Sequence, residues 1–270
     1  MWRSRRWWIW AAFLVALYLV SSYLSRQRVL INTEVWALFH AERPLPEQLE
    51  AVRQDLVHPP LMYLFERVWL PWFGKADAAA KLLPVVINLP ALILFTWLAW
   101  RVTPRWRVAA FLFSGSYLAT GNTLTLVRMY GLVILWMLIA ILIWESWRQR
   151  PTVWRLAAWA AVMVLLVYTH YSGLLILAAF FAVNWLFGPC RLLFAAVSVI
   201  PALCFVPWVL FVLPVYHSRG LETNLWWVRM LLAEPYKGLV SMVYEYLGPM
   251  PVSGAWRYVV AACAALIHLL

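Results

Sequence analysis

The sequence predicts an all-α polytopic membrane protein, built as a single transmembrane domain with about seven or eight membrane-spanning helices. Hydrophobic residues fill 65% of the 270 positions and charged residues only 12%, whereas soluble domains are roughly half apolar and a quarter charged. Several apolar runs approach the roughly 20 residues that cross a bilayer. Many of the 20 Trp residues stand near the ends of these runs, where an indole ring is buried and its N–H stays hydrated.

The net charge of +11 fits a membrane better than a nucleic acid. Lys and Arg residues that flank apolar segments set membrane topology and contact lipid phosphates. No basic run with interleaved aromatic residues resembles a nucleic-acid-binding surface, so we expect the bilayer as a partner and no nucleic acid. The three cysteines lie in or beside apolar segments without metal-ligand spacing, and they predict no metal site.

The first apolar run, residues 7–24, follows Arg3, Arg5 and Arg6. It resembles a signal peptide, but no small-residue cleavage site comes after it. We therefore expect an uncleaved first transmembrane helix with the N-terminus in the cytoplasm.

Residues 25–81 are then expected to form an outer loop that contains interfacial helices. Pro44-Leu45-Pro46 opens a helix, because proline is tolerated in the first helical turn. Apolar residues recur at helical spacing up to Leu56 and polar residues take the other face, as in a helix that lies in the interface plane. Pro59-Pro60 ends this helix. Residues 61–73 form a second apolar piece that is too short to cross.

The rest of the chain alternates between apolar runs and Arg-rich inner loops, which predicts further crossings. The predicted crossings are 82–100, 108–119, Arg128 to about Trp147, 156–168, 172–187 and 192–213. Prolines at 84 and 90 predict kinks, and those at 201 and 207 predict interruptions.

A second outer loop is expected at 214–254, with another interfacial helix around Trp226 and Trp227. The final apolar run, 255–270, is about 24 Å long at 1.5 Å per residue, short of the roughly 30 Å hydrocarbon core. We therefore expect the chain to be truncated inside a transmembrane helix, or to be one module of a longer protein.

Five polar residues that could carry chemistry all map to the outer side: Glu34, Asp55, His58, Arg128 and His170. A carboxylate such as Glu34 can accept a proton from an attacking hydroxyl. Asp55 and His58 are three residues apart at a helix end, so both can face one site, where the acid helps the histidine to stay protonated. Arg128, at the outer end of a membrane helix, suits a phosphate.

Each of these residues also has a structural reading. Glu34 then is a solvated loop acid, and Asp55 and His58 belong to a helix end before a proline turn. Arg128 then reaches a lipid head group, and His170 is a hydrogen-bonded helix-end histidine.

Four short motifs occur in an order that resembles one family. They are Glu34, His58-Pro59-Pro60-Leu61-Met62-Tyr63, Arg128-Met129-Tyr130 and Tyr168-Thr169-His170-Tyr171. Together they resemble the bacterial relatives of the dolichyl-phosphate-mannose–protein mannosyltransferases, polytopic GT-C glycosyltransferases of the family 39 type. The resemblance spans roughly residues 7–254.

The resemblance implies a helical GT-C bundle in the bacterial inner membrane, with a cavity under the outer loop. The implied donor is a sugar on a polyprenyl phosphate, and the acceptor is a lipid, glycan or protein on the outer side. A loop carboxylate, Glu34 or Asp55, acts as general base with inversion at the anomeric carbon. The substrate-binding residues that the resemblance implies are His58, Tyr63, Arg128, Tyr130 and His170. No cofactor is predicted, and a metal requirement is left open.

The chain departs from the family pattern at its acids. Thr33-Glu34 stands where the family usually has Asp-Glu, and Leu126 replaces the acid before Arg-Met-Tyr. Asp55 lies three residues before His58, instead of two. A non-catalytic protein of the same fold that binds lipid phosphate therefore remains an alternative, and a transporter or flippase is a third possibility that requires polar residues through the bilayer midplane.

Overall fold

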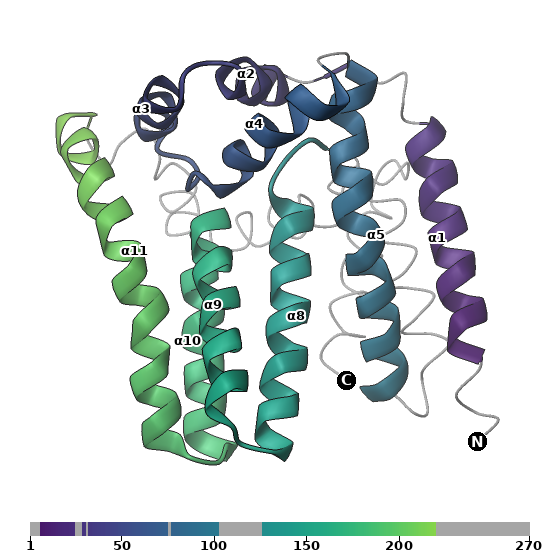
Figure 1. Cartoon of the computed structure of the whole chain (residues 1–270), viewed down its shortest axis with the longest axis vertical. Helices are drawn as coiled ribbons and strands as arrows, with labels where there is room; N and C mark the ends of the chain where they lie inside the picture. Colours follow the sequence, from purple (N-terminus) through teal and green to yellow (C-terminus); the bar gives the residue numbers. More distant parts are fainter. Residues whose placement is uncertain (1–5, 25–28, 31, 75–76, 103–125, 220–270) are drawn as a thin grey trace, which may run out of the picture.

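The computed structural model describes residues 6–24, 29–30, 32–74, 77–102 and 126–219 (Figure 1). Within these ranges the regular structure is entirely α-helical, as predicted. The helices are α1 (Arg6–Leu24), α2 (Asn32–Ala41), α3 (Leu45–Asp55), α4 (Leu61–Phe73), α5 (Asp77–Val102), α8 (Tyr130–Gln149), α9 (Val153–Thr169), α10 (Ser172–Phe187) and α11 (Arg191–Arg219).

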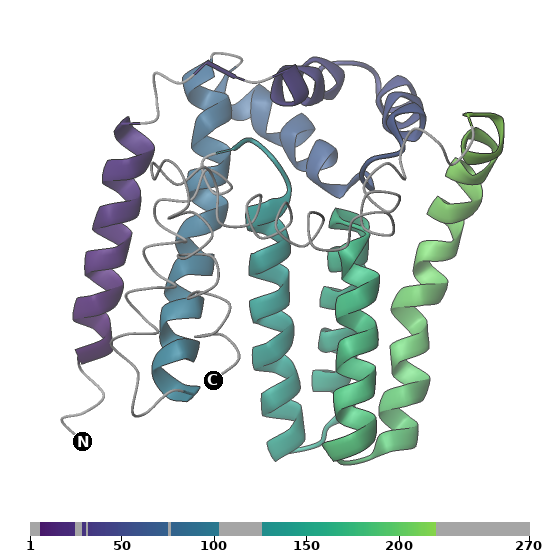
Figure 2. The same cartoon turned by 180° about the vertical axis from the view of Figure 1, so that it is seen from behind.

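Most of these helices run side by side along the long axis, and three short ones lie across one end (Figures 1 and 2). In the bundle, α1 packs on α5, α5 on α8, and α8 on α9, which also contacts α10 and α11. Helices α2, α3 and α4 cover the end of the bundle at which α8 begins and α9 ends. We call these three helices the cap layer.

Three of the described helices are long and apolar enough to cross a membrane: α5 over Asp77–Ala99, α8 over Tyr130–Gln149 and α11 over Arg191–Ser218. Less than half of the most apolar stretch of each is buried within the protein, so large apolar faces point outward. Shorter apolar segments lie in α1, α9 and α10. These faces are those of a membrane protein, because a lipid tail can cover them without cost. The predicted crossings at 108–119 and 255–270, and the helix at Trp226, lie outside the described residues.

The cap layer follows from local sequence signals. Pro44 precedes the first turn of α3, and α3 ends where Leu56 takes a left-handed conformation with φ 59°. Pro60 precedes α4, whose bounds are those predicted. An apolar cluster then joins the cap layer to the bundle, with Val52, Leu56 and Tyr63 packed against side chains of α9 and α11. A non-glycine residue with positive φ is uncommon and is retained only where the surroundings hold it.

Two predictions about the backbone were wrong. The segment around Glu34 is the first turn of helix α2, and not a loop. Helix α11 continues through Pro201, Pro207 and Pro214 to Arg219, so it enters the range expected to be the second outer loop. A proline removes one donor from a helix, and neighbouring groups can satisfy the freed carbonyls. A neighbouring helix also bonds to the backbone of α11 between two of these prolines, since Oη of Tyr168 donates to the carbonyl of Cys204 at 2.8 Å.

Candidate functional site at the cap layer

The candidate residues gather where the cap layer meets the first residues of α8 and the last of α9. Asp55 ends α3, His58 lies in the turn to α4, and Arg128 immediately precedes α8. His170 follows α9. The charge of Arg128 acts on the ionisation of Asp55, His58 and His170, so the fold brings these four side chains into one electrostatic neighbourhood.

Glu34 is completely buried in the first turn of α2. Its Oε1 accepts a hydrogen bond from the backbone N–H of Val127 at 2.7 Å. A carboxylate that accepts a backbone N–H is a strong, charge-assisted partner. Glu34 therefore holds the segment that carries Arg128, and it is not the solvated loop acid that one reading of the sequence suggested.

Arg128 is half-buried, and it bonds to neutral groups. Its Nη2 donates to Nε2 of His58 at 2.9 Å, and its Nη1 lies 3.4 Å from the carbonyl oxygen of Thr33. Within the described part of the chain Arg128 forms no ion pair. A partly buried guanidinium without a counter-ion is energetically costly near a membrane, so we expect it to bind an anion.

His58 is buried, and its protonation follows from its partners. Because the guanidinium can only donate, Nε2 of His58 must accept and the ring proton must sit on Nδ1. Burial lowers the pKa of His58 far below its ordinary value, and the charges of Arg128 and His170 lower it further. His58 is thus neutral. The predicted proton-holding role of this histidine is wrong, because Arg128, and not an acid, is its hydrogen-bonded partner.

His170 has the other tautomer. Its Nδ1 accepts from the backbone N–H of Ser172 at 3.1 Å and lies 2.8 Å from the Ser172 hydroxyl, so the proton sits on Nε2. Burial, and secondly Arg128, lowers the pKa of His170. The His58 and His170 ring centroids are 5.1 Å apart, and the Tyr130 ring lies 6.3 Å from His170. Two neutral imidazoles, each with an N–H, therefore stand beside one guanidinium.

The turn after α9 that presents His170 requires a glycine. A Cβ added at Gly173 would lie 2.8 Å from the carbonyl oxygen of Leu166, in the last turns of α9. Because backbone cannot move aside as a flexible side chain can, only glycine fits this close approach. The Thr-His-Tyr-Ser-Gly turn is thus a packed structure that fixes the position of His170.

Asp55 differs from Glu34 in being partly exposed at the end of α3. Burial raises the pKa of its carboxyl group, whereas Arg128 and a hydrogen bond from the backbone N–H of Val57 lower it, with a net increase. A carboxylate whose pKa is moved toward neutrality and that solvent can reach is suited to accept a proton.

The sequence reading missed one acid at this site. Glu66 lies on the inward face of α4, is only 1% exposed, and has both carboxyl oxygens without a hydrogen-bond partner among the described residues. Burial raises its pKa to about 8, with Arg128 lowering and Glu34 raising it. A signal was present in the sequence, because Glu66 is an acid on the same helical face as Met62, Tyr63 and Leu70.

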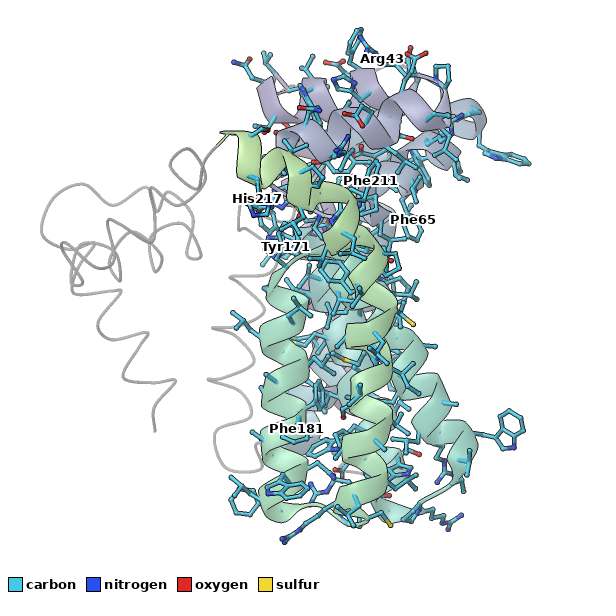
Figure 3. All side chains as sticks on the ribbon, turned by 90° about the vertical axis from the view of Figure 1, so that its left-hand side faces the viewer. Arg43, Phe65, Tyr171, Phe181, Phe211 and His217 are labelled. Atoms are coloured by element: carbon cyan, nitrogen blue, oxygen red, sulfur yellow. The ribbon has the colours of Figure 1, made fainter. Side chains whose placement is uncertain are left out.

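The upper end of α11 is fastened to the same region. Arg53 donates from Nε to the carbonyl of Phe211 at 2.7 Å, with its guanidinium carbon 5.0 Å from the Phe211 ring centre. Tyr216 donates to the carbonyl of Leu56 at 3.4 Å, and Trp208 donates to the Tyr171 hydroxyl at 3.3 Å. Figure 3 shows Phe211 and Tyr171 at this junction, whereas Phe181 lies far down the bundle.

No protein-family model, curated protein or solved structure matches this chain. Among the described residues there is also no group of three or more His, Cys, Asp or Glu side chains that could hold a metal ion.

Proposed function

We propose that this protein is a membrane glycosyltransferase with a GT-C bundle that moves a sugar from a polyprenyl-phosphate donor to an acceptor. The reaction takes place at the cap layer, on the periplasmic side of a bacterial inner membrane, with the N-terminus in the cytoplasm. The observation that carries the proposal is Arg128, a guanidinium with no ion pair among the described residues, beside two neutral histidines that present N–H groups.

This arrangement suits a phosphate for chemical reasons. Arginine binds phosphate oxygens through a planar fork, and neutral imidazole N–H groups add donors without adding charge. The apolar outer faces of the neighbouring helices suit a lipid-linked substrate. Negative charge that develops on a leaving lipid phosphate is stabilised by a cation already in place.

In the proposed reaction Asp55 accepts the proton of the acceptor hydroxyl. The hydroxyl oxygen bonds to the anomeric carbon while the bond from that carbon to the phosphate oxygen breaks. The lipid phosphate leaves with the electron pair, and the anomeric configuration inverts. We assign the general base to Asp55 because Glu34 and Glu66, the other two described acids near Arg128, are buried, whereas Asp55 is partly exposed. Glu34 acts as a positioning residue through the Val127 N–H.

The test uses purified full-chain protein in nanodiscs and a panel of labelled undecaprenyl-phosphate sugars. Asp55→Asn removes the base and should reduce transfer by at least a hundredfold, in line with the loss of general-base catalysis, with little change in donor binding. Glu34→Gln keeps an acceptor oxygen for the Val127 N–H and should retain most activity. Full activity of Asp55→Asn, or loss of activity in a folded Glu34→Gln variant, would overturn the assignment of the base.

A second function is favoured by one observation. Glu34 is hydrogen-bonded to the backbone and Glu66 is buried, so of these three described acids near Arg128 only Asp55 is available for proton transfer. A non-catalytic protein that binds polyprenyl phosphate would bind the bare lipid phosphate, depend on Arg128, and turn over no member of the donor panel.

A further inference from the structure

Helix α4 places a carboxyl group where none is expected. Its inward face is formed by Met62, Tyr63, Glu66 and Leu70, all buried. Glu66 is the one acid on this face, and neither of its oxygens has a hydrogen-bond partner among the described residues. Nearly all buried polar groups in proteins are hydrogen-bonded, so a buried acid without a partner requires an explanation.

Two other buried polar groups, on side chains that the charge of Arg128 also reaches, lack partners within the described structure. One is the hydroxyl of Tyr63, which lies one helical turn before Glu66. The other is Nδ1 of His58, the atom that carries the ring proton. The charge of Arg128 acts on all three side chains, and that of Glu66 acts on Tyr63. These three unpartnered groups therefore lie within the electrostatic reach of Arg128, whereas others, such as those of Thr96, Trp136 and Trp159, lie along the bundle helices.

The charges around this set define what it can hold. At Glu66 and Tyr63 a cationic ligand would be repelled by Arg128, and an anionic group would be repelled by Glu34 and Asp55, whose charges act on these two side chains. Glu66 stays neutral near pH 7, since burial raises its pKa to about 8. A neutral carboxyl group and a phenol each donate one hydrogen bond and accept others, as sugar hydroxyls do. An uncharged polyol is therefore the ligand class that matches them.

We infer that Glu66 and Tyr63 form a subsite for the hydroxyl groups of an uncharged sugar, beside the phosphate that Arg128 binds. This inference rests on the proposed function and assigns the donor sugar to particular residues. Glu66 is fully covered in this structure, so a sugar reaches it by displacing the side chains that cover it. Glu66 is then a specificity-determining residue and Arg128 the anchor.

The test compares the affinity of two probes for the full chain in nanodiscs: undecaprenyl phosphate, and the same lipid phosphate esterified with neutral hexoses or pentoses. The wild-type protein should bind at least one sugar-bearing lipid more tightly than the bare lipid phosphate. Glu66→Leu should remove about tenfold of that advantage, the effect of one lost hydrogen bond to a buried partner. Glu66→Gln is the matched control, because it stays neutral with a donor and an acceptor, and it should keep most of the advantage.

Thermal unfolding separates this role from a structural one. Glu66→Leu replaces an unpartnered buried polar group by an apolar one, so it should raise the melting temperature while it weakens sugar binding. Tyr63→Phe deletes only the hydroxyl and serves if Glu66→Leu does not fold. An unchanged sugar advantage in a folded Glu66→Leu or Tyr63→Phe variant overturns the subsite.

The outcomes also distinguish this subsite from the proposed function. If the wild-type protein binds bare undecaprenyl phosphate through Arg128 but binds no sugar-bearing lipid more tightly, the sugar subsite is overturned and the phosphate site is supported. If the wild-type protein binds neither probe, both the sugar subsite and the proposed function are overturned.

Discussion

Nη2 of Arg128 and Nε2 of His58 are 2.9 Å apart, although the two residues are separated by 70 positions in the chain. This hydrogen bond sets the proton of His58 on Nδ1 and keeps the ring neutral. It also leaves the remaining guanidinium N–H groups of Arg128 free of any ion pair in the described structure. Among the described residues the site thus has one fixed positive charge, that of Arg128.

Arg128→Lys should weaken binding of undecaprenyl phosphate about tenfold, because an ammonium keeps the charge but loses the planar fork. Titration of lipid phosphate into protein in nanodiscs measures the effect. Arg155→Lys is the matched control, since Arg155 contacts the backbone carbonyls of Ser146 and Arg150 at the opposite end of the bundle. Equal affinities for both variants would show that Arg128 is not the phosphate ligand.

His58 should remain neutral at pH 6, where an ordinary histidine with a pKa near 6.5 is mostly protonated. Burial lowers the pKa of its imidazole, so no charge appears in this range. Nitrogen chemical shifts of labelled histidine give the protonation state, and a His58→Asn variant identifies the signal. An imidazolium signal for His58 at pH 6 would contradict the arrangement described here.

Glu66→Gln should change how stability depends on pH. The pKa of Glu66 is about 8 in the folded protein, whereas its ordinary value in an unfolded chain is 4.5. Between these two pH values the folded state keeps the proton and the unfolded state releases it. Stability is therefore complete below about pH 4.5 and falls as the pH rises toward 8, by a few kcal/mol in total. Glutamine does not titrate, so the decrease in melting temperature from pH 5 to pH 8 should be smaller in the variant.

In the comparison of wild type with Glu66→Gln, the contributions of the other titrating groups to the pH dependence of stability cancel. Asp55 and His58 are present in both proteins, and the lowered pKa of His58 acts in the opposite direction, because it favours stability as the pH rises. Parallel melting curves across this pH range would mean that Glu66 is ionised or solvated in the folded protein.

Gly131→Ala should destabilise the protein by about 1–3 kcal/mol, as overpacking does. A Cβ at this position would lie 2.0 Å from Oδ1 of Asn88, whose Nδ2 donates to the Tyr18 hydroxyl at 3.3 Å. Asn88 must therefore move, and that bond is lost. Thermal unfolding in detergent measures the change, and the double variant with Asn88→Ala should lose less than the sum of the two single variants. Additive losses would show that the two positions do not contact.

Patterns along the chain predicted the helices well. The bounds of α4 and α10 agree with those expected from apolar runs and prolines, and α1 differs by one residue. Such segments have a strong local signal, because a run of apolar residues between helix-breaking residues can form little other than a helix in a membrane. Helix α2 was missed, because the segment Asn32–Ala41 mixes polar and apolar residues without a clear break after α1.

The site was predicted as a set of residues but not as a set of contacts. The predicted topology puts Asp55, His58, Arg128 and His170 on one side of the membrane, and the fold does bring these four side chains together at one end of the bundle. Their protonation depends on which atoms meet across long stretches of sequence, and no periodicity reports that. Glu66 was overlooked because one acid in an apolar run reads as a surface residue until its helical face is known.

The fastening of α11 to the cap layer has a consequence for the order of events during synthesis. The bonds from Arg53 to Phe211 and from Tyr216 to Leu56 join residues 158 and 160 positions apart. Contacts so distant in sequence form late, because the intervening chain must first exist and close a long loop. On a nascent chain, the turn that bears Asp55 and His58 therefore lacks these contacts until α11 has emerged, and the geometry of the candidate site is among the last features of the fold to be completed.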